Sequence, residues 1–461
     1  MFFLAASRFF VAASRFWFGA IVHQTMAMPI ANAMKTSRNT HSMPVPLLRA
    51  SRSVLYAGLL FLAALAGGCQ TVPVIDAGVR PSPALIQDAL RAPPRDLAPR
   101  ALFTPVNWTD LPGWNTDALE AAWPALRIGC RALLTERERI KVWQAPCMAA
   151  VGISAASRSA VRAFFENHFS PYRISDADGH ATGLVTGYFE PVLAGSRLRS
   201  AAFNVPLYAP PDDLLTVDLA ELHPELKDKR VRGRVDGTKV VPYWPRRDIE
   251  RGAAELAGKA LVYVSDPVEA FFLEIQGSGR VRLAGGSVIR LNYADQNGHP
   301  YRSIGRVLID RGELPRERAS LQGIIGWAKA NPERLRALLD ENPSYVFFRE
   351  VPPPAPGSLE ALIDGPIGTL GVPVLAGRTI AVDRSVVPLG APIFLATTMP
   401  LSDAPLERLV LAQDTGGAIR GAVRADFFWG TGAEAGRQAG RMRQEGRMWL
   451  LWPKDAPLPA Q

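Results

Sequence analysis

The sequence predicts a mostly β protein with helices, in which the C-terminal region forms a compact β-barrel. From residue 359 to residue 453, short apolar runs alternate with tight turns, starting at TIAVD and ending at RMWLLWP. A single helical stretch, AEAGRQAGRMRQEG at 433–446, intervenes. Because the β segments follow one another without regular helical crossovers, the pattern favours a barrel over a doubly wound α/β sheet.

Length and composition place the chain among ordinary globular proteins. Its 461 residues are enough for two or three domains, and 48% of them are hydrophobic and 21% charged. These values exclude a disordered chain, a collagen and a polytopic membrane protein. The formal net charge of +9 includes six Lys and Arg within residues 1–68, where no Asp or Glu occurs. The remainder carries only +3, so we expect no nucleic-acid partner.

Residues 1–68 have the layout of a signal peptide region. An apolar run of 15 residues, 54–68, follows the basic Arg49 and Arg52 and is too short for a comfortable membrane span. Residues 1–33 contain the near-duplicate pair FFLAASRF and FFVAASRF, which a signal peptide does not need. We therefore interpret 1–33 as an upstream extension that precedes the true start.

A candidate lipid anchor follows the apolar run. Cys69 comes directly after small residues, and the segment 65–69 is similar to a bacterial lipobox, whose Cys is acylated. Gln70 follows instead of Asp, which in such proteins favours the outer membrane over the inner one. We expect a lipid-anchored, Pro-rich tether at 69–100 and a location at the periplasmic face of the outer membrane. The alternative is a plain signal peptide that happens to contain a Cys.

Residues 117–172 show helical periodicity, with two apolar faces. One face contains Leu119, Ala122, Trp123 and Leu126, and the other contains Val161, Phe164, Phe165 and His168.

The two remaining cysteines, Cys130 and Cys147, lie in one segment of this region. In an oxidising compartment they are a candidate disulfide, and two buried free thiols are the alternative. The chain has no CxxC motif and its His residues are scattered, so we expect no metal site.

The middle of the chain has the patterns of strands and helices, and these patterns end at a Pro-rich segment. LVTGYFEPVLAGS (184–196) is typical of a strand, a turn and a Gly break. VPPPAPGS at 351–358 indicates a domain border. Between them we expect strands at 239–244, 261–265, 270–283 and 287–294, and helices at 303–312 and 321–342.

Three aspartates in the C-terminal region end or interrupt apolar β runs: Asp383 in TIAVD, Asp414 in DTGG and Asp426 in ADFFWG. A turn Asp often only bonds its own backbone, and this remains the alternative for Asp383 and Asp414. DTGG is similar to the DTG of aspartic proteases, but those enzymes need two such motifs and the chain has one.

Asp426 differs because Phe427, Phe428 and Trp429 follow it directly. A carboxyl group against aromatic rings, with other carboxylates near, has its pKa raised by burial and by like charge. Such a group stays protonated near neutral pH and can give a proton to a leaving oxygen. The cleavage of a glycosidic bond has this requirement, and Trp and Phe rings beside the acid would stack on sugar faces.

Seven stretches of the chain resemble the family of membrane-bound lytic murein transglycosylase A. They keep the order of the family and span nearly all of 183–450. The stretches are GYFEP (187–191), FFLEIQGSGRV (271–281), YADQNGHPYRSIGRVL (293–308), NPSYVFF (342–348), AVDRSVVPLGAP (381–392), AQDTGGAIRG (412–421) and ADFFWGTGAEAG (425–436).

The resemblance implies a double-psi β-barrel domain with a smaller β domain inserted into it, and a glycan groove between the two. The barrel, with N-terminal helices, would take residues 101–194 and 353–453, and the inserted domain would take 195–352. The three-aspartate segment would lie within 359–453.

The resemblance also implies the reaction. A peptidoglycan lytic exotransglycosylase, a lyase, cleaves the β-1,4 bond between N-acetylmuramic acid and N-acetylglucosamine without water and leaves 1,6-anhydromuramic acid ends. This serves cell-wall turnover and remodelling. No cofactor or metal is needed. The expected partners are glycan strands of peptidoglycan, the membrane through the lipid anchor, and complexes of wall synthesis. The residues alone leave open whether the enzyme cuts only at the ends of glycan strands or also at bonds inside them.

Site residues follow from the same resemblance. Asp426 would act as general acid and then as base, supported by Asp414 and Asp383. Candidates for substrate binding along the groove are Tyr188, Gln276, Ser278, Gly417 and Trp429, with turn geometry alone as the alternative for those in GYFEP and IQGSG. Glu190 and Glu274 rank below Asp426 as possible second acids.

Two other functions stay open at this point. One is a hydrolytic peptidoglycan glycosidase, which would leave reducing ends. The other is a non-catalytic glycan-binding module, for which Asp426 would not be needed.

Overall fold

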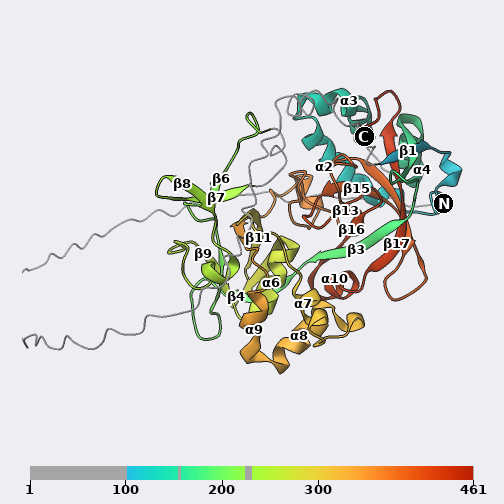
Figure 1. Ribbon diagram of the computed structural model, residues 1–461. Coiled ribbons are helices and arrows are strands. Elements are labelled where there is room, and N and C mark those ends of the chain that lie inside the picture. The colour runs from blue at the N-terminus through green and yellow to red at the C-terminus, as the bar shows by residue number, and fades with distance from the viewer. Residues whose placement is uncertain (1–100, 154–156, 224–230, 460–461) are drawn as a thin grey trace, which may run out of the picture. The chain divides into compact units, whose positions relative to one another are not determined.

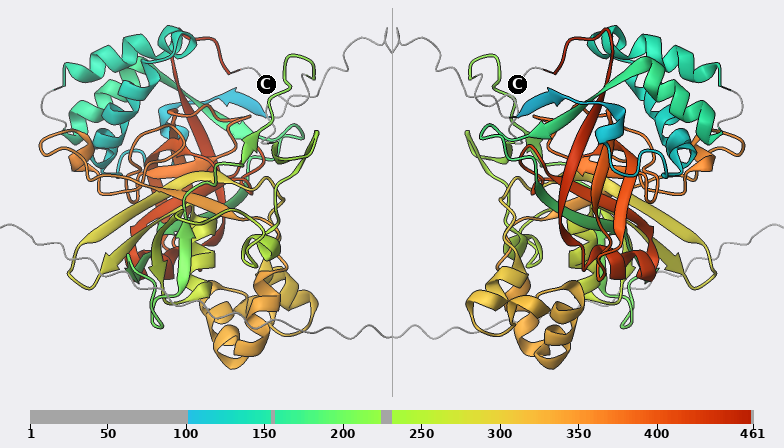
Figure 2. Two further views of the ribbon diagram at one scale, coloured as in Figure 1. Left: turned by 90° about the vertical axis from the view of Figure 1, so that its left-hand side faces the viewer. Right: turned by 90° about the vertical axis from the view of Figure 1, so that its right-hand side faces the viewer.

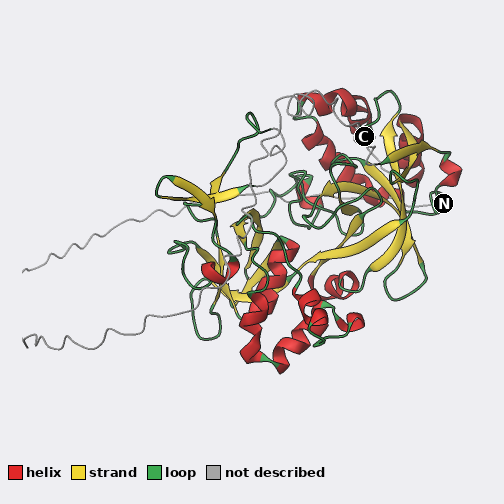
Figure 3. Ribbon diagram, in the orientation of Figure 1, coloured by secondary structure: helices red, strands yellow, loops and turns green. Residues whose placement is uncertain are grey.

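The computed structural model describes residues 101–153, 157–223 and 231–459 (Figures 1 and 3). The signal peptide region, Cys69 and the tether lie outside the described residues. Among the helices in the described ranges, none has the length and apolar character of a membrane-spanning segment.

A closed barrel of six strands forms the first part of the structure. Strand β17 pairs with β14 on one side and with β3 on the other, which closes the ring β17–β14–β15–β13–β16–β3. The pairs β13–β15 and β16–β3 are parallel and the others antiparallel, and this agrees with the expected double-psi barrel. The strands are β3 (Gly183–Glu190), β13 (Thr379–Val382), β14 (Pro392–Thr398), β15 (Pro405–Asp414), β16 (Ala425–Thr431) and β17 (Arg443–Pro453).

N-terminal helices cover the barrel and share its core. Side chains predicted to face inward, such as Leu126 and Val161, are buried in one cluster with Phe394 and Leu450 of the barrel. The helical periodicity of this region is therefore confirmed. The flanking elements are β1 (Leu102–Pro105), η1 (Trp108–Asp110), η2 (Leu119–Ala122), α2 (Trp123–Leu133), α3 (Arg137–Val151), α4 (Arg158–His168) and β2 (Phe169–Ser175), and β1 and β2 extend the sheet beyond β17.

A disulfide joins Cys130 of α2 to Cys147 of α3, with 5.5 Å between their Cα atoms. Both residues are buried in the core that the helices share with the barrel. Of the two alternatives that the sequence left open, the disulfide is confirmed. The bridge joins α2 to α3 within the shared core.

Residues between β3 and β13 build a second sheet structure (Figure 2). A six-stranded sheet has the order β12–β11–β10–β4–β9–β5, and a small three-stranded sheet has the order β6–β7–β8. We call this region the insert. Its strands are β4 (Val192–Ser196), β5 (Val205–Tyr208), β6 (Leu215–Thr216), β7 (Arg232–Asp236), β8 (Lys239–Pro242), β9 (Ala260–Val264), β10 (Ser278–Leu283), β11 (Val288–Gln296) and β12 (Val346–Glu350).

Short helices pack on the insert and on the segment that returns to the barrel. Buried side chains of α6, α7, α8 and α9 share one apolar cluster, and the same helices are grouped together in Figure 1. The helices are α5 (Arg246–Ile249), α6 (Pro267–Gln276), α7 (Ile304–Asp310), η4 (Arg316–Arg318), α8 (Leu321–Ala330), α9 (Pro332–Leu339), η5 (Glu360–Leu362) and, in the barrel, α10 (Gly432–Ala439).

The strand expected at 270–283 is wrong in its first half. Residues up to Gln276 form helix α6, because the Asp266 side chain accepts the N–H groups of Val268 and Glu269 and Pro267 fits the first helical position. Gly277, with φ of 76°, ends the helix. The run FFLEI has no polar–apolar alternation of a strand, and local capping decided its structure.

Two expected helices are shorter than their patterns. Residues 321–342 form α8 and α9 with a break at Asn331, because Pro332 disfavours helical geometry in the residue before it. The helix expected at 433–446 ends at Ala439, and from Arg443 the chain already belongs to β17. Pairing with β3 and β14 overrides the helical propensity there.

Removal of the disulfide tests its contribution to stability. The bridge spans a sequence separation of 17 residues, for which loop-closure entropy gives about 3 kcal/mol. We expect the double variant Cys130→Ala, Cys147→Ala to lose about this much free energy of unfolding, measured by urea denaturation. Reduced wild type should match the variant, and an unchanged midpoint would show that the bridge does not constrain the unfolded chain.

Candidate active site

Asp426 is one of four side chains that form a row across neighbouring strands of the barrel. Ala381 of β13 lies opposite Asp426 of β16 on one side and opposite Asp414 of β15 on the other. Thr186 of β3 lies opposite Asp426 in the parallel β16–β3 pair. Neighbours across strands project from the same face of a sheet, so strand register brings the two aspartates and the threonine together.

The row lies on the outer face of the barrel. Ala425 and Phe427, on either side of Asp426, are fully buried in the main core. Because successive side chains of a strand point to opposite faces, Asp426 points away from that core. A small separate apolar cluster borders it on the outside, made of Tyr188, Val374, Ala381, Ile419 and Phe428.

Asp426 keeps its proton more tightly than an ordinary carboxyl group. Burial among protein atoms raises its pKa to about 6, and the charge of Asp414 adds to this rise. The Thr186 hydroxyl, which donates to Oδ1 of Asp426 at 2.6 Å, and the charge of Arg424 oppose it. The group therefore exchanges its proton close to neutral pH, which suits an acid that later acts as a base.

Asp414 is held in place by its backbone surroundings. Its Oδ1 accepts hydrogen bonds from the Thr369 N–H at 2.9 Å, the Thr369 hydroxyl at 2.8 Å and the Thr415 N–H at 2.9 Å. Burial raises the pKa of Asp414, and these hydrogen bonds oppose the rise.

Tyr188 stands next to both carboxyl groups, and its ring lies 5.0 Å from that of Phe428. Burial, and then the charges of Asp414 and Asp426, raise the pKa of its hydroxyl well above the ordinary value. The hydroxyl oxygen is buried without a hydrogen-bond partner of standard geometry. The hydroxyl is therefore neutral, and its interaction with Asp414 contributes to the raised pKa.

Asp383 is placed differently from the other two aspartates. Its Oδ2 accepts the Gly421 N–H at 2.9 Å, and its Oδ1 accepts the Ser385 hydroxyl at 2.7 Å. Burial works against ionisation, but these hydrogen bonds and the nearby Arg420 outweigh it and hold the pKa of Asp383 below its usual value. The carboxylate fastens the loop between β15 and β16, and its supporting role in catalysis stays a prediction.

Glu190 belongs to a joint between the barrel and the insert. It is 1% exposed and accepts hydrogen bonds from Arg280 Nε at 2.7 Å and from the Thr431 hydroxyl at 2.8 Å. Arg280 also pairs with Asp364 at 2.7 Å. Because its contacts join β3 to the insert and to the end of β16, the structure favours a structural role for Glu190.

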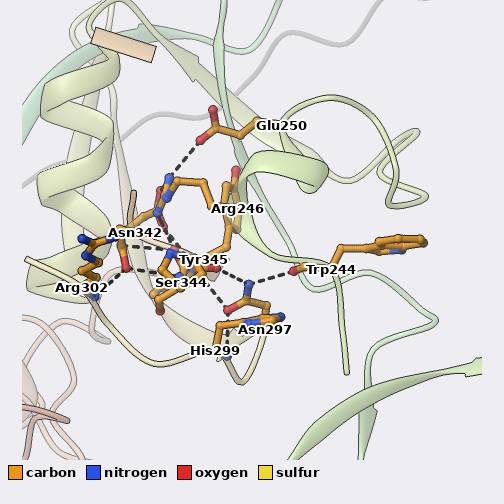
Figure 4. Close-up of polar contacts among 12 residues, drawn as sticks. Trp244, Arg246, Glu250, Asn297, His299, Arg302, Asn342, Ser344 and Tyr345 are labelled. Atoms are coloured by element: carbon orange, nitrogen blue, oxygen red, sulfur yellow. Dashed lines mark hydrogen bonds and ion pairs between the residues drawn. The ribbon is translucent and has the colours of Figure 1, made fainter. Parts of the chain in front are cut away.

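Glu274 lies inside the insert, where it pairs with the buried Arg246. Figure 4 shows the polar contacts of Arg246 with its other neighbours. Arg246 binds both oxygens of Glu274, at 3.0 and 2.6 Å, and donates to the Ser344 carbonyl. Asn297 and Asn342 hold the segment between α9 and β12 by further hydrogen bonds to its backbone. Both carboxylate oxygens of Glu274 thus accept hydrogen bonds, and the ion pair joins α6 to Arg246 inside the insert.

The remaining groove candidates are spread over several places. Gln276 accepts the Phe189 N–H at 3.0 Å across the joint, and Ser278 is buried. Gly417 is exposed in the loop after Asp414. The Trp429 indole donates to Met442 Sδ and meets Phe427 edge to face, so its contacts are packing contacts. Their roles in sugar binding stay predictions.

A cavity of about 220 Å³ separates β3 and α10 from α6, α7 and α8. Gln276 lines it together with Gly187, Phe189 and Tyr301. Asp414 and Asp426 are not among its lining residues. It therefore lies beside the joint and apart from the row of aspartates.

One exposed turn has side chains with the spacing of metal ligands. Asp176, Asp178 and His180 lie close together between β2 and β3. The Asp176 carboxylate accepts the N–H groups of Asp178 and His180, which explains the arrangement as a turn motif.

Sequence reasoning missed two residues of the site. Thr186 bonds Asp426 directly, and Arg424 donates to the Thr186 hydroxyl at 2.9 Å. Strand alternation could have placed Thr186 and Tyr188 on one face of β3. The register between β3 and β16, which are about 240 residues apart, leaves no local signal in the sequence.

Comparison with known proteins agrees with this fold. The family model "MltA specific insert domain" matches residues 184–349, and the "3D domain" matches residues 378–452. The chain is 34% identical over 296 residues to membrane-bound lytic murein transglycosylase A of Escherichia coli K12, covering 62% of this chain and 69% of the relative.

Solved structures give the same result. The crystal structure of MltA from Neisseria gonorrhoeae is 37% identical, with a TM-score of 0.67 over 78% of this chain and 95% of that chain. LtgG of Burkholderia pseudomallei, a lytic transglycosylase, is 47% identical, with a TM-score of 0.52 over 77% and 96%. E. coli MltA with bound chitohexaose is 28% identical, with a TM-score of 0.55 over 77% and 95%.

The closed barrel, the insert and the paired aspartates define a protein of the MltA type. The chain belongs to the family of membrane-bound lytic murein transglycosylase A. The resemblance seen in the sequence is confirmed.

The raised pKa of Asp426 predicts a change in stability with pH. The folded protein binds the Asp426 proton more tightly than the unfolded chain does. The bound proton therefore contributes fully to stability below about pH 4, and this contribution is lost as the pH rises through about 6. At pH 7.5, Asp426→Asn should therefore be more stable than wild type by at most about 3 kcal/mol. Urea denaturation at pH 4 and at pH 7.5 measures the difference, and a difference independent of pH would contradict the prediction.

Proposed function

We propose that this protein is a peptidoglycan lytic transglycosylase and that Asp426 carries its chemistry. The observation that supports this most is a partly buried carboxyl group with a pKa of about 6 on the outer wall of the barrel. Relatives of the same family are lytic murein transglycosylases, and one was crystallised with bound chitohexaose. The substrate is the β-1,4 bond between N-acetylmuramic acid and N-acetylglucosamine.

In the proposed reaction, Asp426 first acts as an acid. Its proton passes to the bridging oxygen while the bond from that oxygen to C1 of muramic acid breaks through an oxocarbenium-like state. The oxygen leaves as a hydroxyl group of N-acetylglucosamine.

Asp426 then acts as a base. The carboxylate takes the proton of the C6 hydroxyl of the same muramic sugar, and O6 forms a bond to C1, which closes the 1,6-anhydro ring. The attacking group is part of the substrate and already close, so no water has to be activated. Asp426 ends protonated, as it began, but now carries the proton that came from the C6 hydroxyl.

The surroundings of the other carboxylates support a mechanism with one carboxyl group. A hydrolytic glycosidase needs a second carboxylate as nucleophile or as base for water. Glu190 and Glu274 are held by arginines, and Asp383 is held by Gly421 and Ser385. Asp414 remains as a neighbour that raises the pKa of Asp426, and we propose this as its supporting role.

Product analysis tests the reaction and the acid together. Purified sacculi are digested with wild type and with Asp426→Asn, and the sugar ends are identified by mass spectrometry. We expect 1,6-anhydro ends from wild type and a rate loss of roughly 10²- to 10⁴-fold in the variant, because Asn cannot donate a proton in this way. Asp403→Asn, which changes an exposed carboxyl group in the turn between β14 and β15, should keep the wild-type rate.

Each other outcome would contradict part of this proposal. Reducing ends would show a hydrolytic glycosidase. Clearing of the wall that does not depend on Asp426 would contradict the assignment of the acid, and binding to sacculi without any cleavage would indicate a glycan-binding module.

We further propose that the chain is held at the periplasmic face of the outer membrane through lipid on Cys69, where it reaches glycan strands and complexes of wall synthesis. The curated relatives are named membrane-bound. Cys69 follows a short apolar run and small residues in the sequence. Two or more acyl chains are sufficient for stable anchoring without a spanning helix.

Fractionation of cells tests the anchor. The full chain with Cys69→Ala should move from the outer-membrane fraction to the soluble periplasmic fraction, because the acylated sulfur is lost. The double variant Cys130→Ala, Cys147→Ala keeps Cys69 and should stay with the membrane. A Cys69→Ala protein that still sediments with membranes would contradict lipid anchoring.

A further inference from the structure

The hydroxyl group of Thr186 lies between a cation and the candidate acid. Arg424 Nη2 is 2.9 Å from the Thr186 hydroxyl, and this hydroxyl is 2.6 Å from Oδ1 of Asp426. Arg424 Nη1 donates to the backbone carbonyls of Leu184 and Ala425, so the guanidinium has a fixed orientation. Thr186 belongs to β3 and Asp426 to β16, which are paired in parallel, and Arg424 directly precedes β16.

Hydrogen-bond chemistry fixes the direction of both contacts. A guanidinium group only donates, so the Thr186 oxygen accepts from Arg424. The hydroxyl has a single hydrogen, which is then directed to Oδ1 of Asp426. Oδ1 is an acceptor in this arrangement, and a protonated Asp426 carries its proton on Oδ2.

We propose that Arg424 and Thr186 are positioning residues that keep the exchangeable proton of Asp426 on Oδ2. The inference rests on the proposed function of Asp426 and adds to it which oxygen reacts. Neither Arg424 nor Thr186 exchanges a proton with the substrate.

One oxygen then performs both proton transfers. Oδ2 gives its proton to the bridging oxygen as the C1–O bond breaks, and it later takes the proton of the C6 hydroxyl as the O6–C1 bond forms. Between the two steps the carboxylate is negative, and the hydrogen bond from Thr186, strengthened by the charge of Arg424, stabilises it. A side chain fixed at Oδ1 cannot rotate to exchange its oxygens, so the second transfer needs no rearrangement.

The charged groups around Asp426 determine the expected effect on pH dependence. Arg424 directly precedes β16, Asp414 ends β15 and Tyr188 comes from β3. On β13 the residue opposite Asp426 is the uncharged Ala381, and on β17 the exposed Arg443 lies opposite Thr186. Burial and Asp414 raise the pKa of Asp426, and Thr186 and Arg424 lower it. Loss of either positioning residue should therefore raise the pKa of Asp426 and extend activity to higher pH, because Asp426 then stays protonated up to a higher pH.

Four variants with intact Asp426 separate positioning from structure. Arg424→Met should move the alkaline limb of the kcat profile upward by roughly half a pH unit or more, since about one pKa unit reflects one strong charge contact. Thr186→Val should move the limb in the same direction and lower the plateau kcat about tenfold, because the proton is no longer confined to one oxygen. Thr186→Ser keeps the hydroxyl and should restore the wild-type profile.

The control removes the same charge elsewhere. Arg282 is exposed on β10 of the insert, and Arg282→Met should leave the pH profile unchanged. Thermal unfolding of each variant confirms that it is folded. A ¹³C NMR titration of the Asp426 carboxyl group gives its pKa without any activity measurement, and it should rise in Arg424→Met and Thr186→Val.

The outcomes distinguish this inference from the function on which it rests. Wild-type pH profiles and an unshifted ¹³C titration in Arg424→Met and Thr186→Val, with Asp426→Asn inactive, would overturn the positioning roles and leave the proposed function intact. Full activity of Asp426→Asn would overturn both. A Thr186→Ser variant that behaves like Thr186→Val would show that packing, and not the hydroxyl, is responsible.

Discussion

The register of β16 in the barrel is the constraint on which the site depends. It sets Asp426 opposite Thr186 on one side and Ala381 on the other, with Asp414 one strand further. The neighbours Ala425 and Phe427 fill the barrel core, and this fixes the outward direction of the carboxyl group. A slip of one residue would turn Asp426 into the core and Phe427 outward, so core packing and the position of the acid are determined together.

A second constraint is the joint between the barrel and the insert. Glu190 ends β3, and its ion pair with Arg280 of β10 joins the two parts at the point where the chain crosses from one to the other. Asn292 of β11 exchanges two hydrogen bonds with the backbone of Ile367. The same returning segment supplies Thr369, which holds Asp414. These contacts connect the insert to the segment that holds Asp414.

The carboxyl groups of the region show how surroundings assign different roles to the same chemical group. Arginine holds Glu190 and Glu274 in buried ion pairs, and backbone N–H groups hold Asp383 in its ionised form. Only Asp426 combines burial with a single hydroxyl donor and a nearby like charge, and its pKa moves to about 6. Among these groups it is the one suited to exchange a proton near neutral pH.

The sequence by itself determined the family and most barrel strands and singled out Cys130, Cys147 and the three aspartates as candidates, because these depend on local patterns and on motifs that stay contiguous in the chain. The structure then decided that the two cysteines are bridged. Local patterns failed where another interaction was stronger: Asp266 and Pro267 started a helix in an apolar run, and strand pairing shortened the helix before β17. Only the tertiary structure decided that Thr186 and Arg424 meet at Asp426 and that Glu190 pairs with Arg280 of the insert. The reason is that strand register joins residues about 240 positions apart, and no local pattern carries that information.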